Sequence, residues 1–423
     1  MSERPLSFCM LTTFYPPFHF GGEAAYVYNV SNALAERGHS VTVVHCVDSY
    51  RVLTSAGPRA GDFPHHPNVT VVRLESRLGA VSPLVTYLTG RPGLKARPLK
   101  ALFEEKRFDV THFHLATLVG GPGVLGYGHG VRLYTTHDHW FVCPMYDLWR
   151  YNREPCDEPH CVRCTLSFKR PPQLWRYTGL LERELRNIDL FISPSKSTIE
   201  QHRRRGFDAP MKRVPYFLPP SAGTPAAEER TEPENDGRPY FLFVGRLVKI
   251  KGAQTLIEAF RTYDKADLLI AGDGVYEREL REQAAGLDHV RFLGRVDRDR
   301  LRSLYAGASA ALVSSLVFET FGLVALEAFA QRTPVIARDH GAVPELITES
   351  GGGFTYSSER ELVEAMEALR RDPELRRELG ERGYRGYLEH WSEEPHLRTY
   401  FEAIEEAREL REGRRPGPVP APA

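Results

Sequence analysis

The segment Ser314-Ser-Leu-Val-Phe-Glu-Thr-Phe-Gly-Leu-Val-Ala-Leu-Glu327 follows an apolar run and passes into a helical pattern that begins at about Phe321. A strand, a loop and a helix in this order form the repeating unit of a parallel α/β sheet. Open α/β sheets bind ligands beyond the carboxyl ends of their strands, which is where Glu319 falls. Glu327 follows on the helix, where it can accept hydrogen bonds from ribose hydroxyls.

The start of this helix is a candidate phosphate site. The amides around Phe321, Gly322 and Leu323, directly after Thr320, lack partners within the helix and carry its positive dipole. The alternative interpretation is a core helix that happens to carry two glutamates. Burying carboxylates without partners is costly, which favours a ligand site.

The same alternation of strands and helices extends along the chain in two halves. Strands are expected at Leu6–Thr13, Ser40–Cys46, Val69–Leu74, Phe108–Phe113, Val131–Thr135 and Asp189–Ile192, then at Tyr240–Val244, Asp267–Ala271, Val290–Leu293, Ala310–Ser314 and Pro334–Ala337. Helical patterns lie at Glu23–Glu36, Ala253–Thr262, Val275–Ala285, Arg298–Tyr305 and Leu323–Gln331. Strands separated by helices predict parallel, doubly wound sheets.

The composition divides the chain. We expect an N-terminal Rossmann-like domain over residues 1–218, a Pro-rich linker over 219–238 and a second Rossmann-like domain over 239–390. A helix over 391–412 and a disordered tail over 413–423 should follow. The α/β prediction is therefore two doubly wound domains that face each other across a cleft, and the C-terminal helix is expected to cross back to the first domain.

Charge and hydropathy exclude several classes of protein. The 423 residues contain 55 basic and 55 acidic side chains, which argues against a dedicated nucleic-acid-binding protein. No apolar run approaches the length that spans a membrane, and residues 1–14 lack the features of a secretory signal. We therefore expect a cytoplasmic protein with at most a peripheral contact to the inner face of the membrane.

A second candidate anion site is the loop Val244-Gly-Arg-Leu-Val-Lys-Ile-Lys-Gly252. It follows a predicted strand and brings Gly245, Arg246 and Lys251 to the start of a helix, an arrangement that suits a diphosphate. Solvated basic residues in a surface loop are the alternative.

The first half carries weaker signals. Gly21-Gly22 lies between the first strand and the first helix, where a ligand can approach the backbone closely. His112 and His114 share one face of a strand, and the next strand ends in Thr136-His137-Asp138. Histidines at the ends of neighbouring parallel strands suggest a site, and His137 is the strongest single candidate.

These pieces together resemble the retaining nucleotide-sugar glycosyltransferases of family 4, which have the GT-B fold. The matching motifs are Gly21-Gly22, Thr136-His137-Asp138, Gly245-Arg246 to Lys251-Gly252, and Glu319-x(7)-Glu327. The resemblance runs from about residue 6 to residue 400. Two departures are Gln331, where the family usually has glycine, and Ala342, which replaces a second glycine.

The resemblance implies roles for these residues. Arg246 and Lys251 would hold the diphosphate, Glu319 the transferred sugar, Glu327 the ribose and Gly294–Arg295 the base. His137 would lie beside the sugar and Gly22 near the diphosphate, while Gly21, His112, His114 and Asp138 would line the acceptor side.

The implied reaction moves a sugar, a hexose, from a UDP- or GDP-linked donor to an acceptor hydroxyl with retention, in glycan, cell-surface polysaccharide or glycoconjugate synthesis. The departing diphosphate would be stabilised electrostatically, without a covalent enzyme nucleophile. Asp297-Arg-Asp299 resembles a metal-binding motif of another transferase fold, but it begins a helix, so no catalytic metal is expected. The alternatives are an epimerase or a phosphorylase on the same fold, or a zinc-stabilised binding protein without turnover.

Four cysteines within residues 143–164 form a separate feature. Cys143, Cys156, Cys161 and Cys164 have a spacing that can supply four thiolate ligands, so structural zinc is one interpretation. Reduced free thiols are the main alternative, ahead of an iron–sulfur cluster or a redox disulfide.

The acceptor is the least specified partner. A glycan, a lipid-linked molecule and a small molecule all fit the resemblance. Lys169-Arg170 and Arg203-Arg-Arg205, with Trp175 and Tyr177, can contact anionic lipid, although solvated helix faces explain them more simply.

Overall fold

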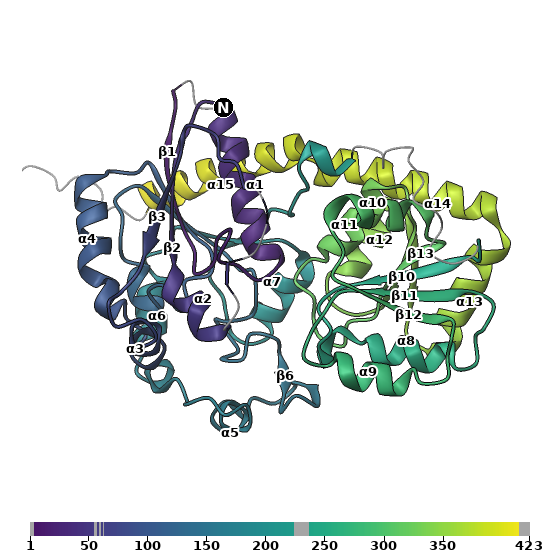
Figure 1. Ribbon diagram of the computed structural model, residues 1–423. Coiled ribbons are helices and arrows are strands. Elements are labelled where there is room, and N and C mark those ends of the chain that lie inside the picture. The colour runs from purple at the N-terminus through teal and green to yellow at the C-terminus, as the bar shows by residue number, and fades with distance from the viewer. Residues whose placement is uncertain (1–3, 55–56, 59–60, 62, 224–236, 414–423) are drawn as a thin grey trace, which may run out of the picture.

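The computed structural model describes residues 4–54, 57–58, 61, 63–223 and 237–413. Most of the expected linker and the expected tail beyond residue 413 lie outside these ranges. Two α/β units stand side by side, and a long helix runs across both of them (Figure 1).

The N-terminal unit contains a parallel seven-stranded sheet of order β3-β2-β1-β4-β5-β8-β9. Its strands are β1 (Ser7–Leu11), β2 (Ser40–Cys46), β3 (Val69–Leu74), β4 (Val110–Phe113), β5 (Val131–Thr135), β8 (Leu190–Ser193) and β9 (Met211–Arg213). Its helices are α1 (Gly22–Glu36), α2 (Val47–Leu53), α3 (Val81–Thr89), η1 (Gly93–Lys95), α4 (Ala96–Glu105), η2 (Pro122–Val124), η3 (Leu174–Tyr177), α6 (Leu180–Leu185) and α7 (Lys196–Arg203). The Cys-rich insertion adds a small hairpin, β6 (Trp149–Arg150) and β7 (Glu154–Pro155), and α5 (Cys161–Ser167).

The C-terminal unit contains a parallel six-stranded sheet of order β12-β11-β10-β13-β14-β15. Its strands are β10 (Tyr240–Val244), β11 (Asp267–Ala271), β12 (Val290–Gly294), β13 (Ala310–Val313), β14 (Val335–Arg338) and β15 (Gly353–Tyr356). The helical elements are η4 (Pro220–Gly223), η5 (Lys249–Lys251), α8 (Ala253–Phe260), α9 (Glu277–Gln283), α10 (Arg298–Gly307), α11 (Leu323–Ala330), α12 (Val343–Ser350), α13 (Glu359–Arg371), α14 (Pro373–Gly386), η6 (Tyr387–Trp391) and α15 (Glu393–Gly413).

The predicted fold of two Rossmann-like sheets is confirmed. The central strands are buried along most of their length, which explains why continuous apolar runs marked them in the sequence. Two edge strands, β9 and β15, were not anticipated, because they are short and only partly buried. The helix expected from about Phe321 begins at Leu323.

The C-terminal helix α15 crosses back to the N-terminal unit, as expected (Figure 1). Tyr400 hydrogen-bonds through its hydroxyl to Nδ1 of His112 at 2.8 Å. Arg411 donates to the carbonyls of Gly130 and His129 and lies 3.2 Å from the carboxylate of Asp189. None of the helices in the described ranges has the length and hydrophobicity needed to cross a membrane.

We expect Arg411→Ala to lower the free energy of unfolding by about 1–3 kcal/mol, because it removes charge-assisted hydrogen bonds that attach α15 to the first sheet. Arg408→Ala is the matched control. Within the described part of the chain, Arg408 forms its ion pair with Glu405 on its own helix, so its loss should cost under about 0.5 kcal/mol. Urea unfolding of both variants measures the difference, and equal costs would contradict this role of Arg411.

Candidate active site

A partly buried carboxylate, that of Glu319, occupies the loop between β13 and α11. Lys251, on η5 after β10, places its Nζ 2.5 Å from Oε1 of Glu319, and Ser315 donates a hydrogen bond to the same oxygen. Strands β10 and β13 are neighbours, so their carboxyl ends bring the two loops together. The two motifs that the sequence singled out separately therefore form one site.

Electrostatics keep this carboxylate ionised. Burial opposes the ionisation of Glu319, but the adjacent Lys251 and the hydrogen bond from Ser315 outweigh it, so its pKa lies below the ordinary value. Arg246, exposed at the end of β10, acts in the same direction. The site thus holds one anion and two cations before any ligand binds.

The backbone of Glu319 is fixed from the other side by the loop after β14. Ala342 donates its amide to the carbonyl of Glu319 at 3.0 Å. Gly341 has a φ of +73°, and a Cβ at this position would lie 2.6 Å from the amide nitrogen of Glu319. Ala342 is fully buried, so the departure from the family pattern at this position adds a methyl group to the core.

Glu327 lies farther along α11, near α10. Its Oε2 accepts a hydrogen bond from the hydroxyl of Tyr305 at 3.0 Å. Burial raises the pKa of Glu327, and the hydrogen bond from Tyr305 only partly offsets this effect. Carboxylate oxygens have several acceptor positions, so capacity remains for a sugar hydroxyl.

The N-terminus of α11 faces the first domain. Gly22 lies so near that a Cβ there would be 2.7 Å from Cδ1 of Leu323. Thr320 donates its hydroxyl to the carbonyl of His137 at 3.0 Å, and the rings of Phe321 and Tyr216 have centroids 5.0 Å apart. The glycine loop and the Thr136-His137-Asp138 segment therefore meet the N-terminal end of α11 across the domain boundary.

The segment expected to hold a base lies at the end of β12. Gly294 has a φ of +65° and accepts a hydrogen bond from the amide of Gly272. Arg295 lies 3.7 Å from Asp273 and is exposed. Gly245 donates its amide to Ala271, which fixes the start of the loop that carries Arg246.

The histidines form a buried network. His137 Nε2 lies 2.9 Å from Nδ1 of His114, and its Nδ1 bonds to the hydroxyl of Tyr216. His112 forms hydrogen bonds through Nε2 to the hydroxyl of Thr135 and through Nδ1 to the hydroxyl of Tyr400 on α15. Burial, and to a smaller extent the neighbouring His114, lowers the pKa of His137 well below its usual value, so the ring is neutral. Both of its ring nitrogens are engaged with protein, and its side chain is 9% exposed.

Three carboxyl groups line the same region with raised pKa values. Burial raises the pKa of Glu23 to about 8 and that of Asp138 to about 7. Asp138 also accepts a hydrogen bond from the amide of Trp140 at 2.9 Å. Asp147, an exposed residue of the Cys-rich insertion, has its pKa raised by partial desolvation beside the site, although Lys251 and Arg246 oppose the shift. The insertion therefore extends to the donor-side cations.

The expected zinc site is not supported. Across the described residues, no group of three or more His, Cys, Asp and Glu side chains is arranged to hold a metal ion. Cys143, Cys156, Cys161 and Cys164 are free, and Cys143 and Cys164 are buried in a small apolar cluster with Met145 and Leu148. Burial raises the pKa of the Cys143 thiol to about 12. The segment Asp297-Arg-Asp299, which resembles a metal-binding motif, lies at the start of α10. The side chain of Asp297 caps this helix by accepting a hydrogen bond from the amide of Arg300.

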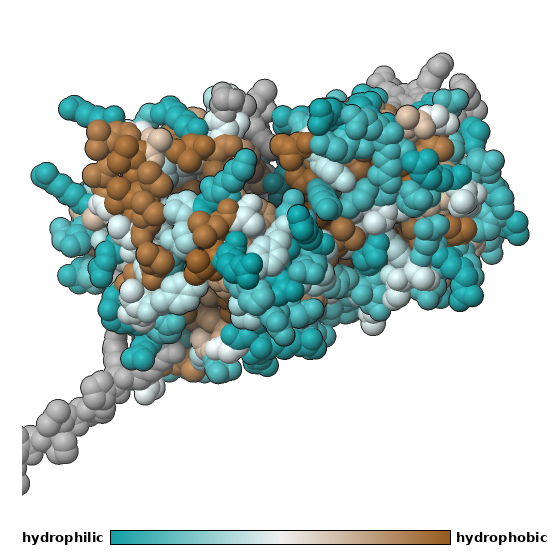
Figure 2. All heavy atoms as spheres, turned by 90° about the horizontal axis from the view of Figure 1, so that it is seen from below, coloured by the Kyte–Doolittle hydropathy of each residue, from teal (hydrophilic) through white to brown (hydrophobic). Residues whose placement is uncertain are grey.

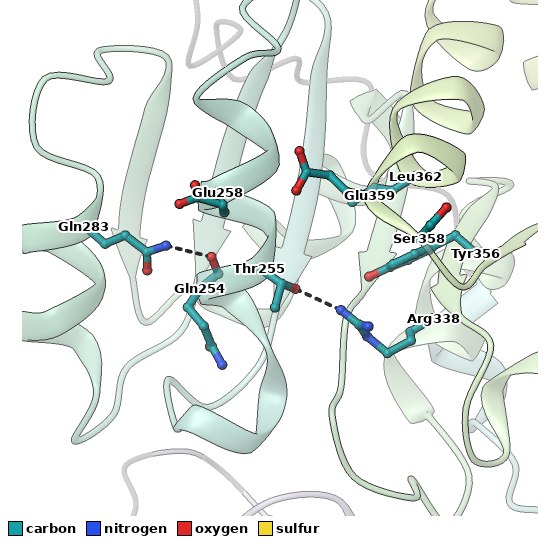
Figure 3. Close-up of a pocket in the computed structure, with 9 residues that line it drawn as sticks. All are labelled: Gln254, Thr255, Glu258, Gln283, Arg338, Tyr356, Ser358, Glu359 and Leu362. Carbon is teal, nitrogen blue, oxygen red and sulfur yellow. Dashed lines mark hydrogen bonds between the residues drawn. The ribbon is translucent and has the colours of Figure 1, made fainter. Parts of the chain in front are cut away.

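A cavity of about 340 Å³ opens elsewhere on the C-terminal unit (Figure 3). Gln283 bonds to the carbonyl of Gln254, and Arg338 bonds to Thr255. The residues that line the cavity are Gln254, Thr255, Glu258, Gln283, Arg338, Tyr356, Ser358, Glu359 and Leu362. None of them belongs to the loops that carry Arg246, Lys251 and Glu319.

Comparison with known proteins agrees with this arrangement. Residues 20–222 match the model of Glycosyltransferase Family 4, and residues 226–386 match the model of glycosyl transferases group 1. The chain belongs to the family-4 type of glycosyltransferase. The two matches meet at the expected linker, so each Rossmann-like unit of this glycosyltransferase corresponds to one family model.

The relatives with similar sequences are named for different activities. Glycogen synthase of Mycobacterium tuberculosis is 28% identical over 82% of this chain and 81% of its own length. Alpha-monoglucosyldiacylglycerol synthase of Streptococcus pneumoniae is 34% identical over 40% of each protein. An uncharacterized glycosyltransferase of Methanocaldococcus jannaschii is 40% identical over 28% of this chain. This chain thus spans only 40% and 32% of the length of the last two relatives.

Solved structures share the fold. Sucrose-phosphate synthase of Thermosynechococcus elongatus superimposes with a TM-score of 0.73 at 20% identity, over 96% of this chain and all of the other. HepE of Anabaena, solved in complex with UDP, superimposes with a TM-score of 0.62 at 17% identity, over 96% of this chain and 99% of its own. These similarities establish the GT-B fold.

Several residues of the site were not named from the sequence. Ser315 stands in the decisive segment, and its spacing from Glu319 was the available signal. Tyr305, Tyr216 and Glu23 carry no motif, because their partners are distant along the chain. Asp147 lies in the insertion that the cysteines marked, but only the folded chain brings it near Lys251.

We expect Gly341→Ala to destabilise the protein by about 1–3 kcal/mol, since the new Cβ would meet the backbone of Glu319 at a positive φ. Gly286→Ala is the matched control, with a φ of +81° and open space around the Cβ. It should cost about 1 kcal/mol from strain alone. Urea unfolding compares the two, and a cost at Gly341 no greater than at Gly286 would refute this close approach.

We expect Asp138→Asn to gain stability relative to the wild type as pH rises. A raised folded-state pKa gives the wild type a contribution that is complete below the ordinary Asp pKa and lost as pH climbs through about 7. Asparagine keeps an acceptor for the amide of Trp140. The difference in free energy of unfolding between Asp138→Asn and the wild type should change by about 2 kcal/mol between about pH 5 and about pH 8. Urea unfolding at the two pH values measures this change. Parallel profiles would mean that Asp138 ionises as in the unfolded chain.

Proposed function

We propose that this glycosyltransferase moves a sugar from a nucleoside diphosphate sugar to an acceptor hydroxyl with retention of the anomeric configuration. The observation that carries the proposal is the convergence of Lys251, Glu319 and the N-terminus of α11 at the carboxyl end of one sheet. Cations and free amides suit a diphosphate, and an ionised carboxylate suits sugar hydroxyls.

Each group has a task in this proposal. The Lys251 ammonium has three donors, of which Glu319 takes one, so it can also hold a phosphate oxygen. Arg246 is exposed at the mouth of the site and adds a second positive charge. As the bond between sugar and diphosphate breaks, negative charge grows on the diphosphate, and these two cations stabilise it. Glu327 binds the ribose, and Gly294–Arg295 faces the base.

Glu319 is a donor-side group in this proposal. Its oxygen is already shared by Lys251 and Ser315, which suits hydrogen bonding to the transferred sugar. The acceptor then attacks from the face that the diphosphate leaves, and its proton passes to the departing phosphate oxygen. No covalent intermediate and no metal ion enter this scheme. His137 positions the sugar pocket through its backbone carbonyl, which holds Thr320.

Uridine is our first choice of nucleotide, because the fold neighbour HepE was solved with UDP and with UDP-glucose. GDP-linked donors are the second choice, since a relative from Corynebacterium glutamicum is named as GDP-mannose-dependent. The acceptor is a hydroxyl of a glycan, a lipid-linked molecule or a small molecule.

We expect one of UDP, GDP, ADP and TDP to raise the melting temperature of the wild type but not of Lys251→Ala. A ligand at 100 times its Kd stabilises by about 2.7 kcal/mol. Lys249→Ala is the matched control, from the same short helical turn, and should respond like the wild type. A diphosphate that stabilises Lys251→Ala equally would remove Lys251 from the site.

Turnover separates the proposed function from its alternatives. Incubation of the matching nucleotide sugar with candidate acceptors should release nucleoside diphosphate, and NMR of the product should show the anomeric configuration of the donor. An inverted product would overturn the retaining mechanism. An epimerised nucleotide sugar would indicate an epimerase, and tight binding without turnover of any acceptor would indicate a binding protein.

A further inference from the structure

Helix α3 has its polar side inward and its apolar side outward. Val81, Leu84 and Leu88 recur at helical spacing on one face and are 45%, 49% and 44% exposed. Ser82 and Thr86, on the opposite face, are fully buried. A surface helix of a water-soluble domain normally shows the reverse arrangement.

The inverted orientation has a specific cause inside the domain. The ammonium of Lys95 is buried beneath α3 and donates to the carbonyl of Ser82 at 3.2 Å, to its hydroxyl at 3.0 Å and to the hydroxyl of Thr86 at 2.9 Å. These three bonds use every donor of the ammonium. They hold the polar face of α3 inward and therefore keep the leucines in solvent.

The exposed leucines are part of a larger apolar surface on the N-terminal unit. Tyr87 of α3 is joined to the segment before α6 by two hydrogen bonds, from Trp175 Nε1 to its carbonyl and from its hydroxyl to the carbonyl of Pro171. Figure 2 shows apolar residues gathered on the underside of this unit. Exposed large apolar side chains are Val52, Leu53, Leu78, Val81, Leu84, Leu88, Leu94, Val162, Leu166, Leu174 and Tyr177. We call these residues the α3 surface.

Two segments that carry most of the α3 surface contain charges of a single sign, and the exposed carboxylates of Glu75, Glu104, Glu158 and Glu182 directly flank them. Residues 76–103 contain five Lys or Arg residues and residues 159–181 contain four, and neither segment contains Asp or Glu. Over the whole chain the two signs balance, at 55 each. The cations are Arg77, Arg91, Lys95, Arg97, Lys100, Arg163, Lys169, Arg170 and Arg176. Apart from buried Lys95 and partly buried Arg170 and Arg176, they are exposed.

We propose that the α3 surface docks on an anionic lipid bilayer. Leucine and valine side chains on the outer faces of short helices can enter the boundary between headgroups and acyl chains, while arginines and lysines beside them reach the lipid phosphates. Tyr177, 63% exposed, combines a ring with a hydroxyl, which suits the headgroup level.

Charge also argues against a second copy as the occupant. In a symmetric dimer the same patch would face itself, and its cations would then meet like charges across an apolar contact. An anionic bilayer supplies both the apolar layer and the opposite charge. Docking itself does not depend on the proposed function. If that function holds, an acceptor with a lipid anchor would be presented to the domain that carries His137 and Asp138.

Vesicle co-sedimentation of the full chain tests the proposal. The wild type should bind vesicles that contain phosphatidylglycerol, bind phosphatidylcholine vesicles far more weakly, and detach as salt increases. The double variant Leu84→Ser/Leu88→Ser should bind at least about tenfold more weakly, because it removes inserted apolar surface. Arg91→Glu/Arg97→Glu should bind about 25-fold more weakly or worse, since each cation near an anionic surface contributes about fivefold.

Matched controls lie on the other domain. Val275, 90% exposed, and Arg278, 80% exposed at its side chain, are far from α3 in the chain and fold. Val275→Ser and Arg278→Glu should leave vesicle binding unchanged. All variants should keep the wild-type melting temperature and the stabilisation by nucleoside diphosphate. A failed nucleotide response with intact vesicle binding would count against the proposed function alone.

Three outcomes would overturn the proposal. The first is a wild type that does not sediment with anionic vesicles. The second is equal loss of binding in the control variants. The third is a wild-type dimer in light scattering that Leu84→Ser/Leu88→Ser converts to a monomer, because a second copy would then occupy the α3 surface.

Discussion

The contact between Lys251 and Glu319 organises the donor side of the molecule. A partly buried carboxylate beyond the end of β13 is stabilised by a positive partner, and Lys251 supplies it from the loop after the neighbouring strand β10. The amide of Ala342 donates a hydrogen bond to the carbonyl of Glu319, and Gly341 packs against the same backbone. The next residue, Thr320, bonds to the first domain. One ion pair therefore lies where both sheets and the domain boundary meet.

The first domain contributes a buried network of neutral histidines to that boundary. His112, His114 and His137 are buried and neutral, and their ring nitrogens bond to one another, to hydroxyls and to the sulfur of Met10. Neutral rings need no counter-ion, so the network can pack closely beneath α15. The carboxyl groups of Glu23 and Asp138 lie nearer the opening, with pKa values raised by burial. The Lys251–Glu319 ion pair thus lies on the C-terminal unit, and the neutral histidines lie on the N-terminal unit.

The Cys-rich insertion and α3 show how local patterns acquire meaning from their neighbours. The spacing of Cys143, Cys156, Cys161 and Cys164 suits a metal, but in the folded chain the buried thiols pack with apolar side chains. The apolar residues of α3 would normally indicate a core-facing helix. Lys95 reverses that orientation, since its ammonium requires the hydroxyls of Ser82 and Thr86 as acceptors.

The sequence by itself determined the two parallel sheets, because buried parallel strands are continuous apolar runs that stand out against the helices between them. It also singled out the two loops that carry Lys251 and Glu319, which the structure brings together, since strand ends and helix starts are local features. The short edge strands β9 and β15 were not predicted from the sequence, because they bury too little surface to produce a recognisable pattern. Only the tertiary structure decided that His137 is enclosed, that Asp147 approaches Lys251, and that the leucines of α3 face outward. Each of these depends on partners far apart in the chain, and burial and charge act through space.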